Sequence, residues 1–165
     1  MAPVAAPVKL EGAKKAIAAL KTAKKTGPCI TICCSTGCRA FGAQKVADAF
    51  SAELEKQGQS GKIEVKLTGC HGFCEQGPIV VLHPDGIFYK SVKPEDCAEI
   101  ISQSVIGKKV IERLLYVNPA TKEKVVYEKD IPFYKKQMRL VFGKNSLIDP
   151  TNLEDYMSFG GYEAL

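Results

Sequence analysis

The sequence of 165 residues contains no apolar run of the length that a membrane-spanning helix needs. Its first residues, MAPVAAPVKLEG, lack the charged start and the long apolar stretch of a secretory signal, so we expect a protein of the reducing cytoplasm. Disulfide bonds are therefore a poor explanation for its seven cysteines.

Several functional signatures are also missing. The chain has no nucleic-acid-binding motif of the RNP, KH or C2H2 type and no arginine-rich strip, so the pattern does not favour a nucleic acid as partner. It has no Ser-His-Asp set, no pair of carboxylates suited to acid and base catalysis, and no glycine-rich phosphate loop. We therefore predict no catalytic residue in this chain.

The composition that remains is that of an ordinary globular protein. With 45% hydrophobic and 25% charged residues, the chain can form one compact domain with an appendage. The formal net charge is +5, and most lysines are interspersed among Asp and Glu. A basic surface of this kind can steer an acidic redox partner.

Four of the cysteines form two unequal pairs. Cys33 and Cys38 are spaced C-x4-C, and Cys70 and Cys74 are spaced C-x3-C. About thirty residues separate the pairs, enough for a helix and a strand that return the chain beside its start. Each pair follows a strand-like run, so two loops at one end of a sheet can present all four sulfurs together. Four thiols gathered in a reducing compartment indicate a metal site.

The hydrophobic pattern predicts the order strand, helix, strand, hairpin, helix. These elements are a strand at 29–32, a helix at 43–57, a strand at 63–67, hairpin strands at 79–82 and 87–89, and a helix from Pro94. The order is typical of the thioredoxin-like α/β fold, a small mixed sheet flanked by helices. We assign residues 1–27 to a leader and an N-terminal helix, 28–110 to this domain and 111–165 to an extension.

The extension has its own pattern. A second hairpin is predicted with strands near 114–116 and 125–127, followed by short helices that begin at Pro132 and Pro150. The segment 131–165 carries many large apolar side chains and is too short to enclose them. We therefore expect this tail to dock on a partner.

The cysteine pattern leaves three kinds of site open. A 2Fe-2S cluster suits the wide spacings and the small residues around the sulfurs, which are Ser35, Thr36, Gly37, Gly69, Gly72 and Gly77. Structural zinc is the first alternative, although zinc sites favour tighter C-x2-C pairs. Thiol–disulfide chemistry at the neighbouring Cys33 and Cys34 is the second, although the chain has no C-x-x-C motif.

Other polar side chains near these pairs are given structural or electrostatic roles. Three cysteines are predicted to be small buried or half-buried side chains, namely Cys29, Cys34 and Cys97. His71 is predicted to face solvent from its loop. The positive charge of Arg39 or Lys66 is expected to favour the reduced form of a cluster.

Two motifs carry a resemblance to a known family. CCSTGCRAFGA at 33–43 and CHGFCEQGP at 70–78 together resemble the thioredoxin-like 2Fe-2S ferredoxins. That family includes the small peripheral subunit of NADH:quinone oxidoreductase and the N-terminal domain of the flavoprotein subunit in NAD-linked, often electron-bifurcating, hydrogenases and related dehydrogenases. The resemblance implies that the 2Fe-2S cluster is bound, as metal and as cofactor, by Cys33, Cys38, Cys70 and Cys74.

The C-terminal third resembles the connector that leads into the FMN- and NADH-binding domain of such flavoprotein subunits. The similar segments are 111–115, 118–123, 130–137, 154–156 and 160–165. The family's glycine-rich flavin and nucleotide loops are not in this sequence, so FMN and NADH are expected on a missing domain or a partner chain. The resemblance implies a cytoplasmic one-electron carrier, part of an NAD(H)-linked oxidoreductase whose flavin and iron–sulfur subunits are its partners.

Overall fold

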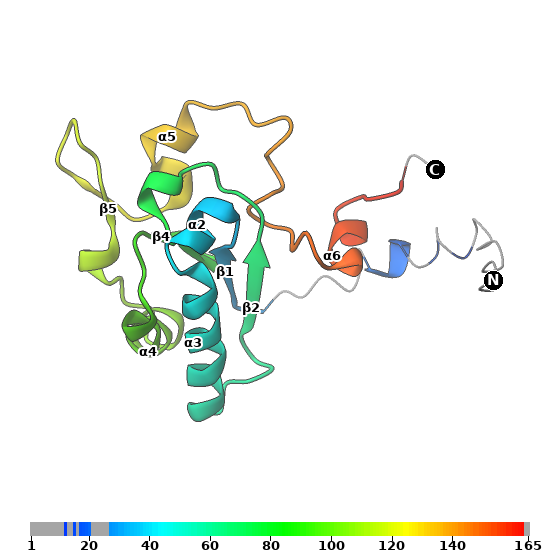
Figure 1. Cartoon of the computed structure of the whole chain (residues 1–165), viewed down its shortest axis with the longest axis horizontal. Coiled ribbons are helices and arrows are strands. Elements are labelled where there is room, and N and C mark those ends of the chain that lie inside the picture. The colour runs from blue at the N-terminus through cyan, green and yellow to red at the C-terminus, as the bar shows by residue number, and fades with distance from the viewer. Residues whose placement is uncertain (1–11, 13–14, 16, 21–26, 164–165) are drawn as a thin grey trace.

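A four-stranded sheet of order β2-β1-β3-β4 forms the centre of the computed structural model, which describes residues 12, 15, 17–20 and 27–163 (Figure 1). β1 (Cys29–Cys33) pairs in parallel with β2 (Glu64–Thr68) and antiparallel with β3 (Val80–His83), which pairs antiparallel with β4 (Ile87–Tyr89). The predicted α/β, thioredoxin-like arrangement is therefore confirmed. Most of the predicted leader and N-terminal helix lies outside the described residues.

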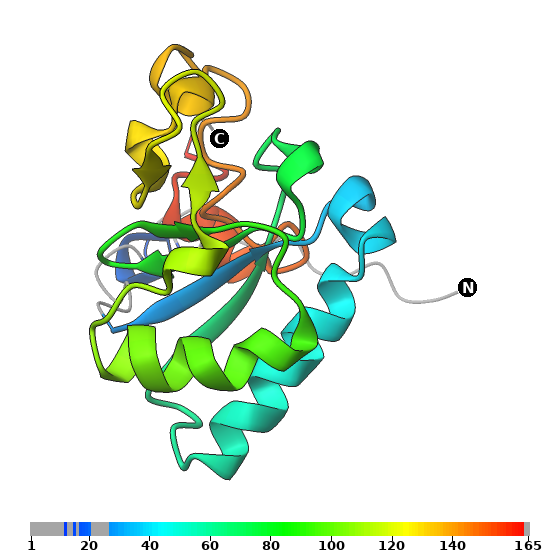
Figure 2. The ribbon, with the colours of Figure 1, turned by 90° about the vertical axis from the view of Figure 1, so that its left-hand side faces the viewer.

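Two helical segments cover one face of this sheet (Figure 2). α2 (Thr36–Ala40) and α3 (Ala43–Lys56) form the crossover that parallel pairing of β1 and β2 requires. The second segment starts as a 3-10 turn at Pro94–Asp96, passes through α4 (Cys97–Glu99) and ends as a π-helical stretch at Ile100–Ile106. Proline at the first helical position and acidic residues in the first turn explain why it begins there.

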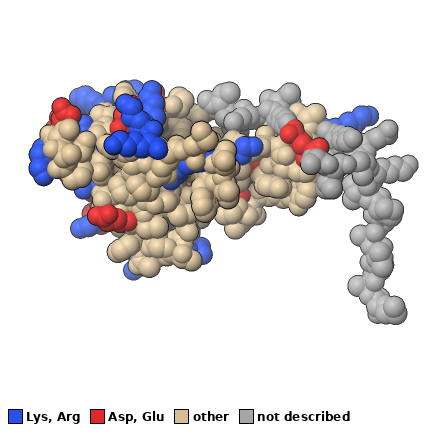
Figure 3. Space-filling model, turned by 90° about the horizontal axis from the view of Figure 1, so that it is seen from above, with Lys and Arg blue, Asp and Glu red and all other residues tan. Residues whose placement is uncertain are grey.

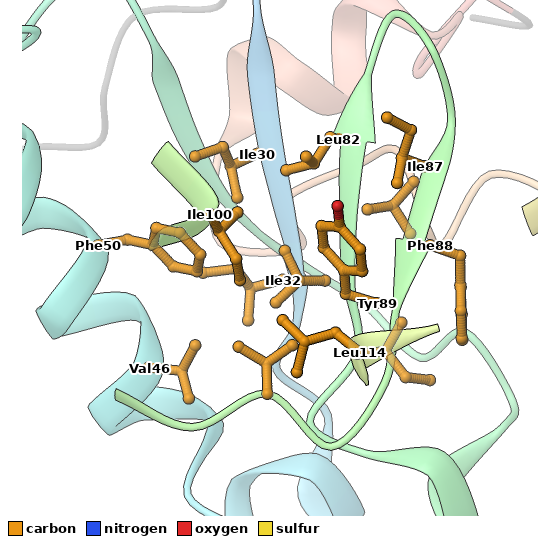
Figure 4. Close-up of a cluster of buried hydrophobic side chains, with 14 of the residues drawn as sticks. Ile30, Ile32, Val46, Phe50, Leu82, Ile87, Phe88, Tyr89, Ile100 and Leu114 are labelled. Atoms are coloured by element: carbon orange, nitrogen blue, oxygen red, sulfur yellow. The ribbon is translucent and has the colours of Figure 1, made fainter. Parts of the chain in front are cut away.

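The hydrophobic core lies between the sheet and these helices (Figure 4). Ile30 and Ile32 alternate with Thr31 along β1, so both isoleucines face the helices, where they meet Phe50 and Ile100. All four of these apolar side chains are fully buried. This packing holds β1 rigidly, and with it the position of the first cysteine pair.

The extension after residue 110 joins the same core. Phe88 N donates to Val126 O at 2.9 Å and Lys90 N donates to Leu114 O at 2.9 Å, so β4 is covered along its outer edge. The buried side chains of the extension are Ile111, Leu114, Leu115, Tyr116 and Ile131. The extension is thus packed on the sheet.

The predicted elements of the extension are present, with shorter strands than expected. β5 (Tyr116–Val117) and β6 (Lys124–Val125) pair antiparallel, and α5 (Pro132–Lys135) and α6 (Leu153–Ser158) follow. Across the sheet from α3, α6 is tied to β2 by an ion pair between Lys66 and Asp155. Among the described residues, no helix has the length and apolarity to cross a membrane.

Candidate metal centre

The two cysteine pairs meet because β1 and β2 are parallel. The last paired residues of the two strands are Cys33 and Thr68, which are partners in the register. Both strands therefore end at the same end of the sheet. β1 leads into the loop Cys33–Cys38, and β2 leads into the loop Cys70–Cys74. The structure therefore places the two predicted cysteine pairs on adjoining loops at one end of the sheet.

Within the site, the thiols are linked in pairs. Cys38 lowers the pKa of Cys33, and Cys70, after burial, raises the pKa of Cys74. The pairs also act on each other, since charge on Cys33 is felt at Cys74. Among the described residues, no three His, Cys, Asp or Glu side chains are grouped as a single metal ion requires. The thiols form two adjoining pairs, as a cluster with two irons needs.

Hydrogen bonding favours the thiolate of Cys33. The thiol of Cys38 and the backbone N–H groups of His71 and Ser35 stabilise this thiolate, and they lower the pKa of Cys33 in spite of burial. The same pairing, with burial, raises the pKa of Cys38. The pKa of Cys74 is raised by burial and by the charge and hydrogen bond of Cys70. Backbone donors from both loops thus favour an anionic sulfur at the centre of the site.

Cys34 is turned away from this group. The strand ladder continues past β1, with Cys33 N donating to Ile79 O and Cys34 N donating to Thr68 O, each at 3.0 Å. Successive side chains on such a ladder point to opposite sides, and the sulfur of Cys34 lies 3.9 Å from Gln44 Oε1. As predicted, Cys34 and Cys29 are half-buried and Cys97 is buried.

Three glycines allow the backbone to pass close to the cysteine sulfurs. A Cβ added at Gly77 would lie 2.8 Å from Cys38 Sγ, and one at Gly37 would lie 3.2 Å from Cys74 Sγ. Gly72, with φ at +82°, donates its N–H to Cys70 Sγ at 3.2 Å. Small backbone positions and N–H donors beside the thiols are what an iron–sulfur cluster requires, so the residues present fit that cofactor.

The prediction that His71 faces solvent is wrong. Its side chain is fully buried, with Nε2 at 3.0 Å from Thr68 Oγ1 and Nδ1 at 3.1 Å from Glu128 Oε1. Glu128 belongs to the extension, which covers this loop. His71 lies in a loop whose sequence is typical of exposed loops, but residues far along the chain cover its side chain.

The two cations expected near the cluster have other partners. Lys66 Nζ lies 2.7 Å from Asp155 Oδ1; burial alone would lower the pKa of Lys66, but the hydrogen bond and charge of Asp155 raise it. Arg39 donates to Gln44 Oε1 at 3.0 Å. The cation that does touch a cysteine loop is Arg139, which donates to His71 O at 2.5 Å.

Sequence reasoning missed the part of the site that the extension supplies. Arg139 lies over the ring of Tyr134, 4.8 Å from its centroid, and Phe133 stacks on Phe73. No spacing rule links these residues to a cysteine loop about sixty positions earlier. The only signal was the excess of apolar residues in the tail.

Fold and site together define a thioredoxin-like protein with four thiols at one end of its sheet. The family model for thioredoxin-like [2Fe-2S] ferredoxin matches residues 9–104, and the chain belongs to this family. The predicted fold, the 2Fe-2S cofactor and the electron-transfer function of a ferredoxin are thereby confirmed.

Individual relatives agree with this assignment. A 2Fe-2S ferredoxin of Clostridium pasteurianum is 35% identical over 89 residues, which are 48% of this chain and 87% of the relative. One from Aquifex aeolicus (strain VF5) is 38% identical over 79 residues, 47% of this chain and 71% of the relative. The solved structure of a thioredoxin-like [2Fe-2S] ferredoxin from Aquifex aeolicus has a TM-score of 0.50 and 29% identity, covering 55% of this chain and 90% of its own.

Proposed function

We propose that the cluster is held by Cys33, Cys38, Cys70 and Cys74, and that the chain passes single electrons within an NAD(H)-linked flavin and iron–sulfur oxidoreductase. The observation that carries the ligand assignment is the common end of the parallel strands β1 and β2, from which both cysteine pairs leave the sheet. The NAD(H) link is supported by the resemblance of residues 111–165 to the connector of flavoprotein subunits.

The burial of the four sulfurs suggests where electrons enter and leave. A 2Fe-2S cluster, when bound, accepts and releases one electron. Cys33 and Cys38 are buried, whereas Cys70 and Cys74 are half-buried. In this proposal the first pair anchors the cluster, and the second loop is the side on which a redox partner approaches.

The surface beside the second loop suits a protein partner. A groove next to this loop is lined by Cys70, Gly72, Phe133, Met138, Arg139 and Phe142. Met138 and Leu140 are each 87% exposed, which is unusual for neighbouring large apolar side chains. Residues 131–148 contain four Lys or Arg and no Asp or Glu, so we expect an acidic rim on the partner. Figure 3 shows Lys and Arg gathered at one end of the molecule, with much of the remaining surface uncharged.

In this proposal, residues 28–110 bind the cluster and residues 111–165 act as a connector that docks on the flavin-containing subunit. FMN and NADH belong to that subunit or to a further domain. Stoichiometric FMN on the purified 165-residue chain would contradict this division of roles.

The ligand assignment is tested by anaerobic purification, followed by quantitation of iron, sulfide and zinc and by EPR after dithionite reduction. Two irons and two sulfides per chain, with a spin-half signal in the reduced protein, are expected. Serine at any of the four proposed ligands should remove or change this signal, and Cys34→Ser should not. One zinc per chain without colour, also after anaerobic reconstitution, would contradict the proposal.

The NAD(H) link needs its own experiment. We expect NADH to reduce the cluster only when an FMN- and NADH-binding subunit of an NAD-linked hydrogenase is added. The control is the same subunit with Leu140→Glu in the ferredoxin chain, which places an acidic group in the exposed apolar surface. Equal rates for both chains would contradict docking at this surface.

A further inference from the structure

The hydroxyl of Tyr134 is buried and has no hydrogen-bond partner among the protein atoms. It is the one buried side-chain oxygen or nitrogen in this condition within the described residues. Leaving a buried hydroxyl unpaired is unfavourable, and folded proteins pair the large majority of such groups. This position therefore calls for an acceptor.

The ring of Tyr134 is held against the second cysteine loop. It packs edge-on to Phe73, the residue before Cys74, with centroids 5.9 Å apart, and edge-on to Phe88 of β4 at 6.1 Å. Arg139 covers the ring at 4.8 Å and at the same time donates to the carbonyl of His71. These contacts fix the ring and, with it, the position of the hydroxyl oxygen.

The electrostatic surroundings tie this hydroxyl to the buried cysteine pair. Burial, and then the charge of Glu128, raise the pKa of Tyr134 above its usual range; the charge of Arg139 lowers it in part, and negative charge on Cys33 and Cys38 adds a smaller upward effect. The hydroxyl thus keeps its proton and is a donor. No protein atom of the described residues accepts from this hydroxyl, the cysteine sulfurs included, so the acceptor that a loaded site would add is a sulfide of the cluster.

We infer that the hydroxyl of Tyr134 donates a hydrogen bond to sulfur at the cluster site and so raises the reduction potential. This inference rests on the proposed function, because it needs a cluster held by the four cysteines. Reduction adds negative charge to the cluster, and a donor to its sulfur stabilises the reduced form more than the oxidised form. Tyr134 lies beyond residue 104, where the match to the family model ends, so this donor comes from the extension.

The experiment uses the full chain with Tyr134→Phe, which removes one oxygen and keeps the ring. We expect the reduction equilibrium to shift about tenfold toward the oxidised form, which corresponds to a midpoint potential lower by about 59 mV for one electron. Pulsed EPR of the reduced protein, compared in H2O and D2O, should show the loss of one exchangeable proton coupling. The metal-free variant should be at least as stable as the metal-free wild type, because an unpaired buried hydroxyl has gone.

Tyr116→Phe is the matched control. The ring of Tyr116 also contacts Phe73, with centroids 5.6 Å apart, and it too belongs to the extension. This variant should keep the wild-type potential and proton couplings. A shift of the same size in both variants would mean that ring packing, not the Tyr134 hydroxyl, sets the potential, and would overturn the inference.

A second substitution keeps the test decisive if Tyr134→Phe loses its cluster. 3-Fluorotyrosine at position 134 has a more acidic, stronger donor on the same ring, so the potential should rise. An unchanged potential in a cluster-loaded variant would overturn the inference and leave the proposed ligands standing. Absence of a 2Fe-2S cluster from the wild type would overturn both.

Discussion

The ring of Phe133 stacks on the ring of Phe73, with centroids 4.3 Å apart and an interplanar angle of 11°. Phe73 precedes Cys74 directly, and Phe133 lies in α5 of the extension. The backbone adds to this contact, because Gly69 N donates to Ile148 O at 3.3 Å. The extension is therefore a structural support of the second cysteine loop.

Phe133→Ala should weaken this support. The substitution removes the stacked ring, and because Phe133 is only half-buried we expect a loss of about 2–3 kcal/mol, less than for a fully buried phenylalanine. Denaturant unfolding of the metal-free protein measures this loss. Met138→Ala, in the exposed part of the same segment, should change stability by less than about 0.5 kcal/mol. Equal losses for the two variants would contradict the role of the stack.

Gly77→Ala should prevent normal assembly of the cysteine site. Its new Cβ would lie 2.8 Å from Cys38 Sγ, a contact that forces the sulfur to move. Gly37→Ala, with 3.2 Å to Cys74 Sγ, should have a milder effect. Gly27→Ala meets only Lys62 O at 3.8 Å and serves as the control. Iron content after reconstitution should fall in the order Gly27→Ala, Gly37→Ala, Gly77→Ala, and any other order would argue against steric control.

Cys97 should make the protein less stable at alkaline pH. Burial raises the pKa of this thiol from 9.0 to about 12, so above pH 9.0 the unfolded chain loses a proton that the folded chain keeps. The free energy of unfolding should therefore fall as the pH rises from 9.0 toward 12. Cys97→Ala should flatten this decline in the metal-free protein. Ile101→Val, a buried neighbour without a titrating group, should shift the whole curve and keep its slope.

Asp155→Asn should loosen α6. Asp155 pairs with Lys66 at 2.7 Å while both side chains are at most 16% exposed, and it also accepts from Asp149 N at 2.7 Å. We expect a local loss of about 1–2 kcal/mol, seen as faster hydrogen exchange over residues 152–160. Asp85→Asn breaks an exposed pair with Lys108 and should leave exchange in its own loop nearly unchanged. Equal changes in hydrogen exchange in the two variants would show that burial of the Lys66–Asp155 pair does not add to its stabilising effect.

Local patterns in the sequence were sufficient to predict the ferredoxin fold and to point to the four thiols as a group. Alternation of Ile30 and Ile32 with Thr31 is a property of neighbouring residues, as is the apolar stripe of α3 with Val46 and Phe50 at its centre. The strand–helix–strand length between the pairs then required a parallel return of the chain, which set both cysteine loops at one end of the sheet.

The surroundings of those thiols were decided by tertiary structure alone. His71 is buried because Glu128 reaches it, Lys66 is paired because Asp155 lies beside β2, and the ring of Tyr134 lies against the second cysteine loop because it packs on Phe73. Each contact joins residues more than fifty positions apart. Periodicity and spacing report on the chain within one or two elements, whereas these partners are chosen by how whole elements pack. The sequence by itself determined which cofactor this protein carries, and only the packing of its extension decided what surrounds that cofactor's site.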